Sequence, residues 1–236
     1  MANSYFQFKQ FIIHQELCAM KVSTEACLLG AWVAAAKPSR ILDIGTGTGL
    51  LALMLAQRID GQIDAVELDE QAAQQAAQNV AASPWVNRVS VIHQDIFDYA
   101  KNNNNRYDLI VSNPPFFTNS LKAETENKNL AKHDSLDFSK ASLAEALKIL
   151  LSADGCAYIL YPELESQQFK QAAEQIGLFC QPALIIRNQP SAAIFRVISL
   201  VSPQSQSLEP EELLIREGRK HSDKFNELLA SYYLKL

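Results

Sequence analysis

The chain has 236 residues, of which 48% are hydrophobic and 20% are charged, and its formal net charge is −5. Length and apolar content suffice for one sizeable core in a single large domain. No apolar run approaches the roughly 20 residues that a membrane-spanning helix needs. The acidic balance excludes a body coated with positive charge for nucleic acid, although it allows a local basic face.

The N-terminal stretch MANSYFQFKQFIIHQELC carries charged residues and has no small-residue cleavage site, so we expect a mature, cytoplasmic protein. The four cysteines include no pair at two-residue spacing. We therefore expect buried free thiols, and neither a zinc site nor a redox dithiol. We further expect a monomer without a bound metal. The cysteines are Cys18, Cys27, Cys156 and Cys180.

Residues 1–39 precede the regular part of the chain and include VSTEACLLGAWVAAA, which predicts a helix. Ser23 or Thr24 should open this helix, with Glu25 in its first turn. From residue 40 onward, short apolar runs typical of strands alternate with helical stretches. The runs are RILDIG, QIDAVEL, VSVIHQ, YDLIVSN, CAYILYP, QPALIIR and IFRVISLV.

This alternation predicts an α/β fold with a mostly parallel sheet between two layers of helices. The last two runs are joined by RNQPSAA, a hairpin-type connection, so the last strand should be antiparallel. Seven strands in this arrangement resemble the Rossmann-like three-layer sandwich of class I methyltransferases, here over residues 40–202. Residues 203–236, with ELLIREG as a strand candidate and a helix from Ser222, should dock as an appendage on one domain spanning 1–236.

The stretch LDIGTGTGLLALML reads as a strand, a tight glycine turn and the start of a helix. Gly45 and Gly47 permit positive φ and close approach of a ligand, and Gly49 opens the helix. A dinucleotide fingerprint would need its third small residue at Leu50, and a phosphate loop would need a Gly-Lys-Ser/Thr ending. The D-x-G-x-G-x-G spacing that starts at Asp43 instead resembles the loop that binds S-adenosylmethionine.

Two acidic residues end the next two strands. Glu67 follows the glycines by about 20 residues, where a carboxylate can accept both ribose hydroxyls, and Asp95 is placed to bind the adenine amine. Taken singly, such acids are more often helix caps or solvated residues, and Asp69 fits better as the cap of the next helix. The glycine turn and two acids in order on successive strands indicate an S-adenosylmethionine site at the carboxyl ends of the strands.

The fourth strand ends in SNPPFF, where Pro114 and Pro115 must stop the strand and hold Asn113 extended. Alone, this stretch fits an asparagine-capped turn with core phenylalanines equally well. At this crevice, however, it resembles the D/N/S-P-P-Y/F/W motif of amino-methyltransferases. The Asn113 side-chain oxygen and the Pro114 carbonyl would each accept one N–H of an exocyclic amine. Phe116 would stack on the base, and we assign Phe117 to the core, although it could line the pocket.

The whole chain resembles the bacterial valine-tRNA adenine-N6 methyltransferases, through FIIHQELCAMKVSTEACLLGAW, LDIGTGTG, SNPPFF and HSDKFNELLASYYL. The resemblance implies methylation of the adenosine 3′ of the anticodon, with S-adenosylmethionine as donor and tRNA as partner. It also implies that Lys21 and Thr24 approach the carboxylate end of the cofactor, although a surface lysine and a helix cap are alternatives. One departure is His221, near which the family usually has a tyrosine.

Basic residues in two segments are candidates for phosphate contacts, which position RNA without specifying it. The segment IREGRKHSDK has a net charge of +2. A solvated charged face is the alternative for both segments, and a solvated loop histidine is the alternative for His133. The candidates are Lys122, Lys128, Lys132, His133, Arg216, Arg219, Lys220 and Lys224.

Methyltransferases that act on other substrates share this N-P-P-aromatic motif. A release-factor glutamine methyltransferase usually has a long helical domain before the glycine loop, for which there is little room here. A ribosomal guanine-amine methyltransferase is a second alternative. A DNA adenine methyltransferase would need a target-recognition insertion, and none is large enough. A cofactor-binding module without turnover is the alternative of another class, which the intact NPPF motif disfavours.

Overall fold

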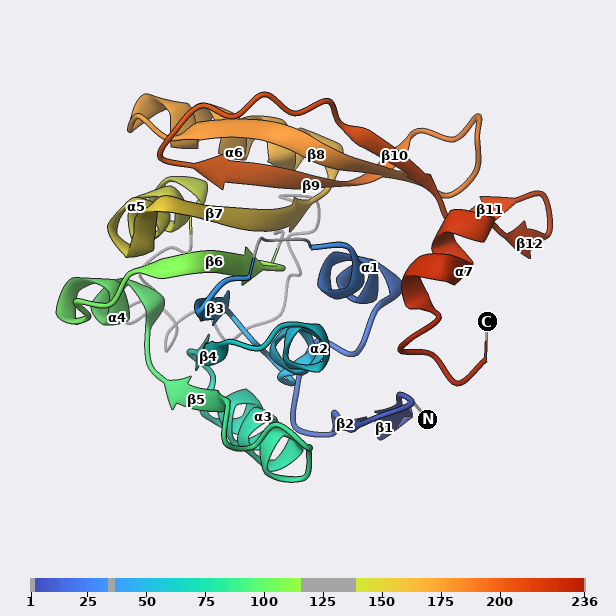
Figure 1. Ribbon diagram of the computed structural model, residues 1–236, viewed down its shortest axis with the longest axis horizontal. Helices are drawn as coiled ribbons and strands as arrows, with labels where there is room; N and C mark the ends of the chain where they lie inside the picture. The colour runs from blue at the N-terminus through green and yellow to red at the C-terminus, as the bar shows by residue number, and fades with distance from the viewer. Residues whose placement is uncertain (1–2, 34–36, 116–138, 236) are drawn as a thin grey trace, which may run out of the picture.

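The computed structural model describes residues 3–33, 37–115 and 139–235. At its centre is an eight-stranded sheet in the order β10-β8-β9-β7-β6-β3-β4-β5 (Figure 1). Strand β9 runs antiparallel to both of its neighbours, whereas the other pairs in this sheet are parallel. The strands are β3 (Arg40–Ile44), β4 (Gln62–Glu67), β5 (Val89–His93), β6 (Tyr107–Ser112), β7 (Leu151–Tyr161), β8 (Phe179–Arg187), β9 (Ile194–Ser202) and β10 (Glu211–Leu214).

Helices cover both faces of the sheet, as the alternating pattern predicts (Figure 1). Helices α1, α2 and α7 contribute to one buried apolar cluster, and α4, α5 and α6 contribute to a second cluster on the opposite face. The three-layer class I methyltransferase architecture is therefore confirmed. The helices are α1 (Thr24–Trp32), α2 (Leu50–Arg58), α3 (Glu70–Ala81), α4 (Ile96–Asn102), α5 (Lys140–Leu150), α6 (Glu163–Gln175) and α7 (Asp223–Leu229).

Three helix starts agree with the residues that the sequence proposes as caps. The Ser23 hydroxyl accepts the first-turn amide of α1, the Asp69 carboxylate accepts that of α3, and the Ser222 hydroxyl accepts that of α7. Each cap satisfies one of the amides that a helix leaves unpaired at its N-terminus.

The strand count is the one correction to the predicted sheet: the sequence predicts seven strands, whereas the sheet in the structure has eight. The segment EELL, which includes the start of the ELLIREG stretch expected in a docked appendage, pairs in parallel with the outer edge of β8, with Glu211 opposite Leu184. That edge offers backbone groups that a further strand can satisfy. Two short hairpins, β1–β2 (Tyr5–Gln7, Ile12–His14) and β11–β12 (Arg216–Glu217, Lys220–His221), lie outside the sheet. Within the described ranges, no helix is long and apolar enough to cross a membrane.

Candidate active site

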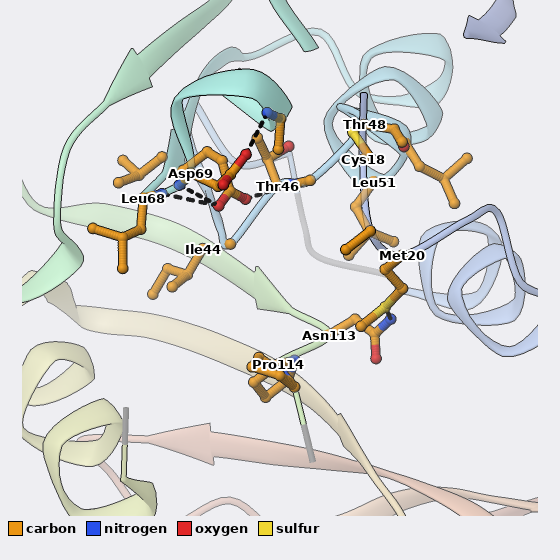
Figure 2. A pocket seen from close by; sticks show the side chains of 18 of the residues that line it. Cys18, Met20, Ile44, Thr46, Thr48, Leu51, Leu68, Asp69, Asn113 and Pro114 are labelled. Atoms are coloured by element: carbon orange, nitrogen blue, oxygen red, sulfur yellow. Dashed lines mark hydrogen bonds between the residues drawn. The ribbon is translucent and has the colours of Figure 1, made fainter. Parts of the chain in front are cut away.

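Strands β3, β4, β5 and β6 end at one crevice, because β3 lies between β4 and β6 and the direction of strand addition reverses there. The Ser112 hydroxyl donates to the Ile44 carbonyl at 2.8 Å and so ties the ends of β6 and β3 together. A cavity of about 970 Å³ opens at these strand ends (Figure 2). This is the place where open α/β sheets bind ligands.

The glycine turn forms one wall of the cavity. Gly45 and Gly47 have φ of 69° and 56°, and a Cβ added to either would meet no atom within 4 Å. Their backbone therefore faces open space that a ligand can occupy. Gly49, with φ of 81°, does not line the cavity. A Cβ added to it would lie 3.5 Å from Ala76 of α3. Its role in the structure is close helix packing.

Asp43 is fully buried behind the turn and does not line the cavity. Its Oδ2 accepts hydrogen bonds from the Thr46 hydroxyl at 2.5 Å and from the Ala52 amide at 3.1 Å. These bonds fasten the turn to the first turn of α2. Burial raises the pKa of Asp43 to about 7, partly offset by the two hydrogen bonds.

Glu67 lines the cavity at the end of β4. Its Oε2 accepts the Gly47 amide at 2.8 Å, and its Oε1 accepts the amides of Leu68 and Asp69 at 2.9 and 3.0 Å (Figure 2). These bonds orient the carboxylate. Oε1 already accepts two hydrogen bonds, whereas Oε2 accepts one and keeps a lone pair for a ligand hydroxyl.

Asp95 combines both roles that the sequence allows for a strand-end acid. Its Oδ1 caps α4 by accepting the amides of Phe97 and Asp98 at 2.7 and 3.1 Å. It also lines the cavity, and its Oδ2 takes part in neither capping bond.

Asn113 lies where β6 meets the cavity. Its Nδ2 is 3.9 Å from the Met20 sulfur, and its Oδ1 is shielded from solvent with no hydrogen-bond partner among the described residues. Pro114 and Pro115 also line the cavity, the first buried and the second exposed. A buried acceptor without a partner is costly in a folded protein unless it serves a ligand.

The candidates in the N-terminal block and after Pro115 are less clearly connected with the cavity. Lys21 lines the cavity, but its Nζ donates to the backbone carbonyls of Gln15 and Cys18 at 2.5 and 2.8 Å. Thr24 is exposed outside the cavity and hydrogen-bonds Tyr233. Phe116 and Phe117 lie outside the described residues, as do Lys122, Lys128, Lys132 and His133.

The four C-terminal basic candidates lie apart from the cavity. Lys224 donates to Glu211 at 2.7 Å. The other three, Arg216, Arg219 and Lys220, are exposed on the β11–β12 hairpin and are called the hairpin cations below. His221 packs on Phe225, with ring centroids 4.4 Å apart.

Several lining residues were missed by the sequence reasoning. Leu68 and Ile96 follow the two strand-end acids directly and supply apolar surface, and an exposed fraction of 60% for Leu68 suits contact with a flat ring. The sequence could have indicated both residues, because each directly follows an acid that is predicted to bind the ligand. Residues 14–22, called the N-terminal strap below, form the opposite wall through Cys18, Met20 and their neighbours.

Comparison with known proteins agrees with this geometry. The family model described as methyltransferase small domain matches residues 18–148. Proteins named tRNA1(Val) (adenine(37)-N6)-methyltransferase from Bacteroides fragilis and Trichodesmium erythraeum are each 42% identical, with full coverage of both chains. One from Yersinia enterocolitica is 37% identical over 97% of this chain and 92% of its own. The chain belongs to the tRNA1(Val) (adenine(37)-N6)-methyltransferase family.

Solved structures support the fold of this family member. A ribosomal protein L11 methylase from Lactobacillus delbrueckii matches with a TM-score of 0.55 and 20% identity, covering 80% of this chain and 82% of its own. A T. thermophilus 16S rRNA N2 methyltransferase, in complex with AdoMet and guanosine, matches with a TM-score of 0.58 and 18% identity. It covers 85% of this chain and 50% of its own.

The cavity lining fits S-adenosylmethionine. Two glycines leave open backbone where a ligand can approach, and Oε2 of the oriented Glu67 carboxylate can accept a ribose hydroxyl. Leu68 and Ile96 can hold the adenine between apolar surfaces. Asn113, whose oxygen is buried without a described partner, lines the same cavity, where an amine could meet the methyl group.

Proposed function

We propose that the protein methylates N6 of adenosine 37 in a valine tRNA, with S-adenosylmethionine as the methyl donor. The observation that carries the proposal is the buried Asn113 Oδ1, an acceptor without a described partner at the cavity. The names of relatives that match this chain from end to end support the choice of substrate.

The chemical difficulty lies in the amine. The lone pair of an adenine amine is delocalised into the ring, which makes the nitrogen a poor nucleophile. Asn113 Oδ1 and the Pro114 carbonyl would each accept one N–H, which favours a pyramidal nitrogen and aims its lone pair. Proline suits this task because it keeps its carbonyl while its ring stiffens the turn.

The donor supplies a methyl group already activated by its sulfonium charge, so no residue has to remove a proton before transfer. This chain then contributes mainly proximity and alignment. Gly45, Gly47 and Glu67 would hold the donor, while Asn113 and Pro114 would hold the amine. The target base cannot be reached while stacked, so it must be extruded from the anticodon loop.

The hairpin cations are the proposed tRNA contacts among the described residues. They follow β10, which is parallel to β8 at the edge of the sheet, and the hairpin lies on the side toward which β6 and β10 point (Figure 1). Exposed arginine and lysine side chains in this position suit phosphate contacts beside the strand ends. Such a role places the protein in the cytoplasm with its tRNA.

Transfer of a tritiated methyl group tests the substrate. Unmodified bulk tRNA, ribosomal subunits and release factor are offered in parallel, and the labelled products are digested to nucleosides or amino acids. We expect label only in N6-methyladenosine from tRNA. Label in methylguanosine or in protein would overturn the proposal.

A further inference from the structure

The orientation of the Asn113 amide decides whether it can serve the reaction. A carboxamide presents an acceptor oxygen on one side and a donor NH₂ on the other, and a half-turn exchanges them. In the structure the nitrogen faces the Met20 sulfur at 3.9 Å, and the oxygen points away from Met20 (Figure 2). After a half-turn the amide would present N–H groups to an incoming amine, which needs acceptors.

Met20 favours the productive orientation. A thioether sulfur is a weak acceptor with no hydrogen to donate, so it attracts the amide nitrogen and repels the amide oxygen. Met20 is 48% exposed, and yet its side chain is directed toward Asn113 (Figure 2).

The first half of the strap that carries Met20 is held in place by α3. The Asn79 side chain exchanges two hydrogen bonds with the His14 backbone, at 2.9 and 2.8 Å. The Gln75 oxygen accepts the Leu17 amide at 3.2 Å. Both α3 side chains are almost completely buried, with exposed fractions of 1% for Asn79 and 2% for Gln75.

The strap is also closed on itself next to Met20. Gln15 Oε1 accepts the Val22 amide at 2.9 Å, and Lys21 Nζ donates to the Gln15 and Cys18 carbonyls. Lysine and glutamine therefore bridge the two arms of the loop that presents Met20. A side chain on such a braced loop can hold a neighbour in one orientation.

We propose that Met20 is a positioning residue, whose sulfur keeps the Asn113 oxygen turned toward the substrate amine. The inference rests on the proposed function of Asn113 as an acceptor. Met20 itself touches neither the amine nor the transferred methyl group in this scheme.

Met20→Leu tests the proposal, because leucine keeps the volume of the side chain and cannot accept a hydrogen bond. Met54→Leu is the matched control, since Met54 is buried in α2 away from Asn113. We expect kcat of Met20→Leu to fall about five-fold, as loss of one weak hydrogen bond implies. The KM for tRNA and the dissociation constant for S-adenosylhomocysteine should stay within about two-fold.

Nuclear magnetic resonance of the free protein supplies a readout that does not depend on turnover. The Asn113 side-chain NH₂ signals are identified by their absence in Asn113→Asp. They should shift in Met20→Leu and stay in place in Met54→Leu. Unmoved signals or an unchanged kcat would each overturn the proposal. Wild-type protein that fails to methylate tRNA would refute the proposed function instead, while the NMR comparison still tests the Met20 contact.

Discussion

Asp43 makes the stability of the protein depend on pH in a way that Asp43→Asn should abolish. Burial raises its pKa from 3.8 to about 7, so the folded state holds a proton that the unfolded chain has already released. Between these values the folded protein binds more protons, and stability falls as pH rises. Below pH 3.8 the contribution is fully present, and above about 7 it is lost.

The magnitude follows from linkage. Well inside the window each pH unit changes the free energy of unfolding by about 1.4 kcal/mol, and the slope halves near pH 7, where Asp43 is half ionised. The loss between pH 5 and pH 7 is therefore about 2 kcal/mol. Asparagine keeps an acceptor for Thr46 and Ala52 but cannot ionise. The difference between wild type and Asp43→Asn should therefore change by about 2 kcal/mol across this range and then level off.

Urea denaturation at pH 5, 6, 7 and 8, without cofactor, measures this difference. Asp108→Asn is a control, because the pKa of Asp108 is shifted in the opposite direction to that of Asp43. Burial alone would raise the pKa of Asp108, but hydrogen bonds from Ser39 and Arg40 outweigh it and lower the pKa. Its contribution is present above pH 3.8 and is lost only as pH falls further, so its difference from wild type should be constant from pH 5 to 8. Parallel curves for wild type and Asp43→Asn would refute the reasoning.

Three further predictions concern the turn, the strap and the hairpin. Gly47→Ala should lower the stability by about 1 kcal/mol, because Gly47 has a positive φ. It should also weaken S-adenosylhomocysteine binding at least about ten-fold in calorimetry, since the new Cβ enters the cavity. Unchanged affinity would contradict the role of the turn. Asn79→Ala removes three side-chain hydrogen bonds, to the strap and to Thr48, and should lower urea stability by about 2–3 kcal/mol, whereas a loss below about 0.5 would be inconsistent. Reversing the charge of the three hairpin cations should raise the KM for tRNA at least about ten-fold and flatten its salt dependence. The same change at Lys101 and Arg106, near the opposite strand ends, should not; equal effects would argue against a specific tRNA surface.

Local signals account for most of the fold that the sequence predicts. Apolar runs separated by helical stretches specify the crossover units, and Ser23, Asp69 and Ser222 mark helix starts because capping depends on near neighbours. The eighth strand depends on something else, the availability of the β8 edge in the folded sheet. Four residues with the pattern EELL carry no local signal for that pairing.

The site was predictable where motif spacing controls position, and less so where side-chain direction does. Gly45, Gly47, Glu67, Asp95 and Asn113 all line the cavity, although their roles toward a ligand stay predictions. A long lysine can turn either way, and the carbonyls of the strap that Lys21 binds are brought together only by folding.

Helix α3, with the sequence EQAAQQAAQNV, gives a second example of a contact that only folding creates. Alternating alanine and glutamine suggest a solvated helix, and yet Gln75 and Asn79 are buried because the strap covers them. Nothing near them in the sequence indicates that contact, since their partners in the strap lie more than 50 residues away.

The central claim is that the Asn113 oxygen holds the amine in line for transfer, and Asn113→Ala tests it most directly. In single-turnover assays with saturating S-adenosylmethionine and unmodified tRNA, transfer should fall at least about 100-fold, as for loss of one preorganised polar group in an active site. Affinity for S-adenosylhomocysteine should stay within a few-fold, because the cofactor is held by other residues. Turnover close to that of the wild-type protein, with normal cofactor affinity, would contradict the account.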